Sequence, residues 1–171
     1  MGLYDENHVI GLGMDENKVK LSLFDVTNVE NPTEIAKNTI PGDYSYSEAL
    51  YDPKAFLFDR QKQLLVIPVS ITQYGVIPPI DETAENKTTF SSTEGGYWQG
   101  AYIFNITLSG FEFKVGITHQ DNKNQEYFYG DYNKNVNRAL FIDNILYTIS
   151  NTKVDLNSLT DLSQIATIQL N

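Results

Sequence analysis

Cysteine is absent from this 171-residue chain, which excludes both a disulfide framework and a thiolate metal site. Histidine is scarce, and His8 and His119 lie far apart without the spacing of a metal-ligand pair. No apolar stretch approaches the length of a membrane span, and the first residues, MGLYDENHVI, contain no basic start and no apolar segment typical of a signal peptide. These absences predict no metal, no cofactor and no membrane insertion of this segment.

Positive charge is also in short supply. Lys and Arg number 12 against 22 Asp and Glu, which gives a net charge of −10. An electric field of that sign repels phosphate backbones, so nucleic acid is not expected as a partner. The chain is nevertheless 41% hydrophobic and 12% aromatic, which is too apolar for a disordered segment and sufficient for a buried core.

Three similar segments indicate a repeat of antiparallel strands. Each consists of an apolar pair, an Asp, a short polar turn and an apolar strand, and the pairs with their Asp are residues 3–5, 57–59 and 141–143. Asp suits such a turn because its side chain accepts hydrogen bonds from nearby backbone N–H groups. A second hairpin follows each segment, so four strands form one unit. The period is about 50 residues once an insertion in the middle unit, residues 72–97, is set aside.

The central strands are apolar on both faces, which distinguishes stacked sheets from a sheet with one wet face. In AYIFNI, residues 101–106, neither of the two sets of side chains that point to opposite faces contains a charged residue. The pattern predicts an all-β fold of β-propeller-type four-stranded antiparallel blades, with a β-sandwich as the alternative. The expected units are a first-blade remnant at residues 3–41, a second blade at 50–119 and a third at 135–170. About two and a half to three blades make an incomplete ring, because propellers close with about four or more.

Three segments carry a family resemblance: SEALYDPKAFLFDRQKQLLVIPV, YWQGAYIFNI and RALFIDNILYTISNTKV. They resemble the C-terminal β-propeller domain of secreted archaeal and bacterial proteins of unknown function, over essentially the whole chain. The resemblance implies an extracellular or cell-surface location and supplies no catalytic residues. We expect the chain to be a fragment whose terminal blades either self-associate or pack against the missing blades of the full-length protein.

Aromatic residues gather in the loops at one end of the expected blades. Loops that join successive blades share this end with loops between the second and third strands of each blade. They hold eight of the eleven Tyr and the single Trp, residues that combine a large contact area with few torsions. The alternative, that many of these rings pack beneath the loops, stays open. The residues expected to bind a glycan or peptide ligand are Tyr44, Tyr46, Tyr74, Tyr97, Trp98, Tyr127, Tyr129 and Tyr132.

Two functional hypotheses follow. The first is a structural or binding module of an exported or cell-surface protein, with the aromatic loop face as its binding surface. The second is part of a propeller hydrolase whose active site needs residues from the missing blades, and its nearest candidate acids here are Asp121, Glu126 and Asp131. An enzyme should gather inward-facing carboxylates or His at the ring axis, whereas a binding module should show exposed aromatic residues on a loop face. The sequence favours the second pattern.

Overall fold

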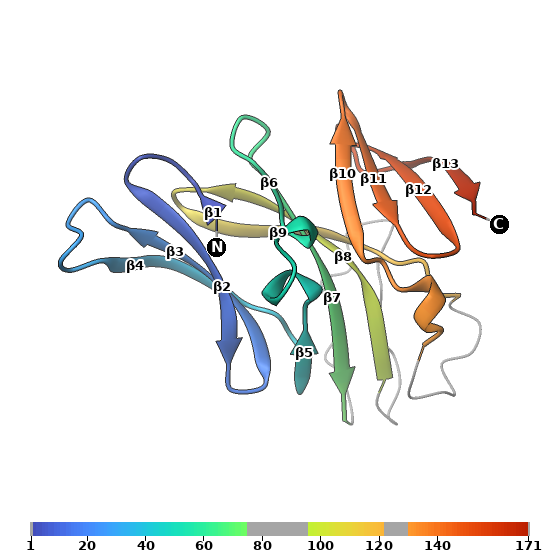
Figure 1. The fold of residues 1–171 in the computed structure, drawn as a ribbon, viewed down its shortest axis with the longest axis horizontal. Helices are drawn as coiled ribbons and strands as arrows, with labels where there is room; N and C mark the ends of the chain where they lie inside the picture. Colours follow the sequence, from blue (N-terminus) through green and yellow to red (C-terminus); the bar gives the residue numbers. More distant parts are fainter. Residues whose placement is uncertain (1, 75–95, 122–129, 171) are drawn as a thin grey trace.

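The computed structural model describes residues 2–74, 96–121 and 130–170, which form three antiparallel sheets in chain order (Figure 1). The first blade contains β1 (Gly2–Leu3), β2 (His8–Asp15), β3 (Lys18–Asp25) and β4 (Thr33–Thr39). The middle blade contains β5 (Tyr44–Tyr46), β7 (Leu64–Gln73), β8 (Gly96–Thr107) and β9 (Gly110–Ile117), with β6 (Leu57–Asp59) also paired to β7. The last blade contains β10 (Arg138–Ile142), β11 (Ile145–Ile149), β12 (Lys153–Ser158) and β13 (Gln164–Gln169).

The helices of the described residues are short 3₁₀ turns in the connections between strands. They are η1 (Glu48–Leu50), η2 (Pro53–Ala55) and η3 (Tyr132–Lys134). None of the helices in this part of the chain has the length and apolar character needed to cross a membrane. The prediction of an all-β fold is therefore confirmed.

The repeated Asp turns are largely built as the sequence predicts. The backbone N–H of Asn7 donates to Asp5 Oδ1 at 2.9 Å, and the backbone N–H of Lys62 donates to Asp59 Oδ1 at 2.7 Å. The third turn differs, because Asp143 itself adopts a left-handed backbone with φ of 53°. Asp tolerates that conformation better than most residues, so Asp143 favours its turn through its backbone conformation rather than through a side-chain hydrogen bond.

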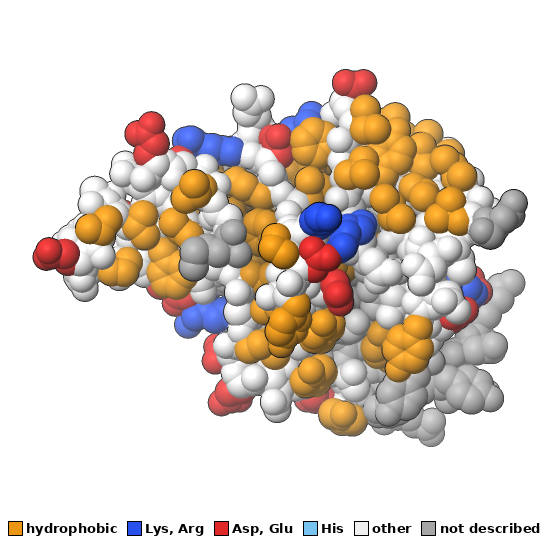
Figure 2. Space-filling model, in the orientation of Figure 1, with side chains coloured by type: hydrophobic (Ala, Val, Ile, Leu, Met, Phe, Trp, Pro, Cys, Tyr) orange, Lys and Arg blue, Asp and Glu red, His pale blue; other side chains and the backbone are white. Residues whose placement is uncertain are grey.

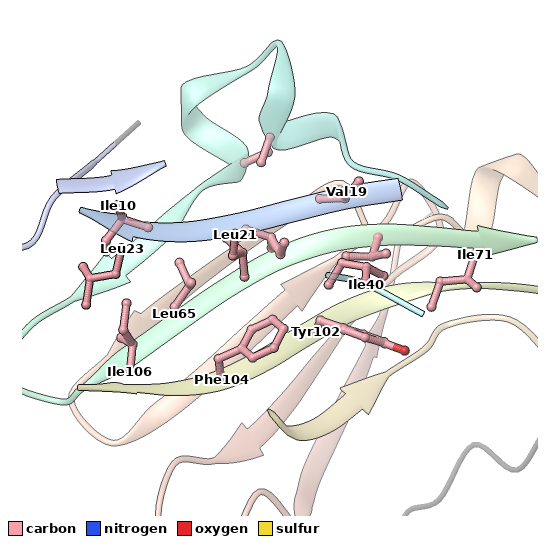
Figure 3. Close-up of a cluster of buried hydrophobic side chains, with 14 of the residues drawn as sticks. Ile10, Val19, Leu21, Leu23, Ile40, Leu65, Ile71, Tyr102, Phe104 and Ile106 are labelled. Atoms are coloured by element: carbon pink, nitrogen blue, oxygen red, sulfur yellow. The ribbon is translucent and has the colours of Figure 1, made fainter. Parts of the chain in front are cut away.

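The middle blade is buried on both faces, as the sequence predicts. One face packs on β2 and β3 of the first blade, with Ile10 and Leu21 among the contacts (Figure 3). The other face packs on the last blade, with Ala139 and Leu146 among the contacts. Because a two-sheet sandwich leaves no sheet covered on both faces, this arrangement identifies propeller-type blades. The middle blade supplies Leu65, Ile67, Tyr102 and Phe104 to the first interface and Leu64, Val66, Ala101 and Ile103 to the second.

The segment predicted as an insertion begins and ends inside the middle sheet. The ladder between β7 and β8 continues through Thr72 opposite Tyr97 and Gln73 opposite Gly96. Both ends of the 72–97 segment therefore belong to strands, and residues 75–95 lie outside the described residues.

The outward faces of the two outer blades differ in chemistry. On the first blade, Glu34 accepts a hydrogen bond from Ser22 at 2.5 Å and forms an ion pair with Lys20 at 2.7 Å. On the last blade, the strand pairing aligns Leu140, Tyr147 and Leu156, and Ile142 lies opposite Ile145. Figure 2 shows hydrophobic side chains gathered over β10–β13. We call the set Leu140, Ile142, Ile145, Tyr147, Ile149, Leu156 and Ile168 the apolar outer face.

Candidate functional site

Six tyrosines come from β5, the residue after η1, the residue after β7, the start of β8 and η3. β5 and the end of β7 lie toward the lower edge of the view in Figure 1. Tyr74 and Tyr132 are 66% and 67% exposed, and Tyr44 and Tyr51 are also exposed. Tyr46 and Tyr97 are half-buried. We call the set Tyr44, Tyr46, Tyr51, Tyr74, Tyr97 and Tyr132 the tyrosine edge. Its exposed rings give a surface that a ligand can reach.

Several of these rings are held in place by neighbours. Tyr46 stacks on Tyr51 with ring centroids 6.1 Å apart and an interplanar angle of 21°. The hydroxyl of Tyr46 donates to Glu48 Oε2 at 3.3 Å, and burial together with the Glu48 charge raises the pKa of Tyr46. Its phenol therefore stays protonated at neutral pH and keeps this hydrogen bond to Glu48. A stacked, hydrogen-bonded pair loses little conformational freedom when a ligand binds.

The remaining tyrosines belong to neighbouring strand ends. Tyr44 begins β5 opposite Thr72, and the backbone N–H of Tyr74 donates to Asp43 Oδ2 at 2.5 Å, so these two positions share a corner of the sheet. The Tyr97 hydroxyl donates to Ser70 Oγ at 3.2 Å, and burial raises the pKa of Tyr97. The structure thus brings Tyr44, Tyr46, Tyr74 and Tyr97 to one edge of the middle blade.

Trp98 does not belong to this surface, and the expectation that it does is wrong. The side chain is 4% exposed and lies in the core beside Tyr102, with ring centroids 5.0 Å apart. Two glycines make room for the indole, because a Cβ added at Gly100 or Gly116 would come within 2.8 or 2.7 Å of it. The physical reason is that β8 begins at Gly96, so Trp98 already lies in the sheet. Tyr127 and Tyr129 lie outside the described residues.

The two described candidate hydrolase acids, Asp121 and Asp131, form contacts with η3 and its flanking residues. Asp131 Oδ1 accepts from the backbone N–H of Asn133 at 2.9 Å at the start of η3, and the Asp121 carboxylate forms an ion pair with Lys134. Glu126 lies outside the described residues. Within residues 2–74, 96–121 and 130–170, no group of three or more His, Asp and Glu side chains is arranged to hold a metal ion.

His119 is the centre of a buried polar cluster between the middle and last blades. Its Nδ1 lies 2.9 Å from Ser150 Oγ, its Nε2 lies 2.9 Å from Thr148 Oγ1, and Asp155 Oδ2 is 3.4 Å from Nε2. Burial lowers the pKa of His119 to about 4, against the opposing attraction of Asp155. A neutral imidazole has one donor and one acceptor, and the two hydroxyls can satisfy both. The cluster therefore joins two blades without a charge on the ring.

A cavity of about 500 Å³ lies between the same two blades, at the end opposite the tyrosine edge. Sequence reasoning missed it, because its walls come from turns and strands far apart in the chain. In the sequence, the longest continuous segment that contributes to the cavity lies in the turn SLTDLS of the last repeat, residues 158–163. The lining residues include Lys62, Gln63, Leu64, Ile103, Asn105, Lys114, Asn144 and residues 159–162.

Three successive antiparallel sheets, two of four strands and a middle one of five strands that is buried on both faces, define a propeller-type protein. The family model described as "Beta propeller domain" matches residues 1–162, and the chain therefore belongs to the β-propeller domain family.

The relatives of this chain are themselves uncharacterized proteins of archaea. One, from Archaeoglobus fulgidus, is 40% identical over 70 residues, which are 41% of this chain and 11% of that protein. Another, Uncharacterized protein MJ1554 from Methanocaldococcus jannaschii, is 28% identical over 145 residues, which are 84% of this chain and 16% of that protein. The chain thus spans less than a fifth of the length of either curated relative. No solved structure matches it significantly.

Proposed function

We propose that this chain is a structural and binding module of an exported or cell-surface protein, and that its tyrosine edge binds a glycan or peptide ligand. The observation that carries the proposal is the exposure of Tyr44, Tyr51, Tyr74 and Tyr132 at one edge of the blades. Tyr rings stack on sugar rings and on peptide side chains while their hydroxyls form hydrogen bonds. The exported location rests on the family resemblance, and no observation on the described residues favours the hydrolase alternative.

If the tyrosine edge binds the ligand, shortening the exposed side chains at its corner should weaken binding. We expect the Tyr44→Ala/Tyr74→Ala double variant to bind roughly thirty-fold more weakly, because each contact tyrosine of a binding surface contributes on the order of 1 kcal/mol. The measurement is a screen of the 171-residue chain on arrays of neutral oligosaccharides and of peptides, followed by titration of the best ligand. Leu108→Ala, at an exposed apolar position in the opposite turn, is the control. Equal affinities of wild type and double variant would reject the proposal.

The apolar outer face supports a proposal about partners. In a longer propeller another blade would cover it, and in the isolated 171-residue chain we propose that a second copy does. The face has the same flat apolar character as the two interfaces between blades, and Ile142 at its edge is 56% exposed. The outward face of the first blade, with Lys20 paired to Glu34, is too polar for this role. A symmetric pair of last blades is therefore the expected contact.

Self-association can be measured directly by light scattering and sedimentation at micromolar concentration. We expect a dimer that buries well over about 1,000 Å² in total. Leu140→Glu/Ile168→Glu should convert it to a monomer, because each substitution would bury an unpaired charge of the same sign in the contact. Ile35→Glu, at a comparably exposed position on β4, should leave the dimer intact. A monodisperse wild-type monomer would contradict the proposal.

A further inference from the structure

The cavity between the middle and last blades has fixed walls. On the last blade, the backbone N–H of Leu159 donates to Asn144 O at 2.9 Å, and Asn144 Nδ2 donates to Thr160 Oγ1 at 2.7 Å. The backbone N–H of Leu162 donates to Ser158 O at 2.9 Å. These bonds tie the connection between β12 and β13 to the turn between β10 and β11. The wall is therefore formed before any ligand arrives, which reduces the entropy lost on binding.

Two residues of the lining hold unusual backbone conformations. Leu162 and Gln63 have φ of 61° and 51°, in the left-handed region that bulky side chains rarely adopt. Asn157 lies directly behind Leu162 and donates its Nδ2 to Leu162 O at 3.0 Å. Its Oδ1 is buried and accepts no hydrogen bond from the described residues. Glu16 and Asp143 hold the same backbone conformation in other hairpin turns, so the unusual feature of this wall is the unsatisfied acceptor of Asn157, because buried polar atoms are nearly always paired.

The lining of the cavity contains two lysines and one carboxylate. Lys62 and Lys114 are its two cations, and Asp161 is its single lining carboxylate. Asp161 Oδ1 already accepts from the backbone N–H and the hydroxyl of Ser163, at 3.1 and 2.8 Å. Lys114 pairs with Glu112 at 2.6 Å, outside the lining. Because Glu112 offsets the charge of Lys114, Lys62 is the lining cation left for an anionic ligand.

Lys62 is the cation best placed for a ligand. Its ammonium group lies 5.2 Å from the ring centroid of Phe141 and has no carboxylate partner among the described residues. Lys62 is exposed, so its ammonium group is open to an incoming anion, while the Phe141 ring holds it beside the apolar wall. A dianion is disfavoured, because Lys62 is the single lining cation without a carboxylate partner among the described residues.

We propose that this interblade cavity binds a small hydroxylated carboxylate of the size and class of a hexuronate. Lys62 pairs with the carboxylate, while Asn105, Asn144 and Thr160 offer amide and hydroxyl groups to ligand hydroxyls. Leu64, Ile103, Leu159 and Leu162 provide an apolar wall for the ring. The volume of about 500 Å³ lies within the range of small-molecule sites. This site is separate from the tyrosine edge and does not depend on it.

The test uses glucuronate as the probe, titrated into the 171-residue chain at low salt by calorimetry and by NMR chemical shifts. We expect binding that weakens about tenfold in Lys62→Gln, as expected for loss of one charge-assisted contact. Lys37→Gln, an exposed lysine on the first blade, is the matched control and should bind as wild type does. Tyr44→Ala/Tyr74→Ala should also bind as wild type does, which separates this result from the proposed function of the tyrosine edge.

Three outcomes would overturn the proposal. The first is no binding of glucuronate at millimolar concentration. The second is equal binding of glucose, which lacks the carboxylate, or tighter binding of inorganic phosphate. The third is equal loss of affinity in Lys62→Gln and Lys37→Gln, which would indicate attraction to the general surface rather than to the cavity.

Discussion

Replacing Trp98 with Ala should lower the free energy of unfolding by about 3–5 kcal/mol, the usual cost of truncating a buried large aromatic side chain. The indole is 4% exposed and packs against Tyr102. Gly100 and Gly116 lie beneath it, and neither has a side chain that could fill the space left behind. The cavity would therefore persist, and the lost contacts would not be replaced.

Urea unfolding of the purified chain, followed by circular dichroism, measures this change. Tyr51→Ala is the matched control, because Tyr51 is a large aromatic residue that is 77% exposed. Its substitution should change the stability by less than about 1 kcal/mol. If Trp98→Ala were as mild as Tyr51→Ala, the assignment of Trp98 to the core would be wrong.

The placement of Trp98 also shows where sequence reasoning reaches its limit. The repeat and the two-sided burial of the AYIFNI strand are local patterns with a period of two, so the blades could be predicted from them. The start of β8 could not, because Gly96 and Tyr97 resemble a loop in sequence and become strand through pairing with Gln73 and Thr72. The glycine at position 100, two residues after the Trp and on its face, was the one local signal of a buried indole.

The candidate sites differ in predictability for a related reason. Because antiparallel strands alternate in direction, the order of the strands alone decides at which end of a blade each loop lies. Tyr44, Tyr74 and Tyr132 could therefore be assigned to one edge. The interblade cavity depends instead on the distance between β8 and the turn at residues 159–162. That distance is set by the packing of Val66, Ile103 and Leu146 between the blades. Side-chain packing of this kind has no periodic trace in the sequence.

Acid should destabilise the contact between the middle and last blades through His119. Burial lowers the pKa of this imidazole from 6.5 to about 4, with Lys153 adding to the effect and Asp155 opposing it. A group with a lowered pKa in the folded state contributes stability above its unfolded pKa and loses it as the pH falls through the folded value. The contribution of His119 to the free energy of unfolding is therefore fully present above about pH 6.5 and falls as the pH drops toward 4. The loss amounts to roughly 3 kcal/mol.

The pH range of this loss of stability distinguishes His119 from the carboxylates. Asp25, Asp52 and Glu34 also have lowered pKa values, through hydrogen bonds to Thr27, Lys54 and Lys20, but their unfolded values of 3.8 to 4.5 place their effect at lower pH. Unfolding free energies measured by urea between pH 7 and 4.5 should therefore decline in the wild type and in His8→Gln, and stay nearly level in His119→Gln. Hydrogen exchange should show the earliest loss of protection in β11 and β12, which carry Thr148 and Asp155. Parallel declines in wild type and His119→Gln would show that another group is responsible, because Gln takes up no proton on unfolding, whereas His119 gains one in this pH range.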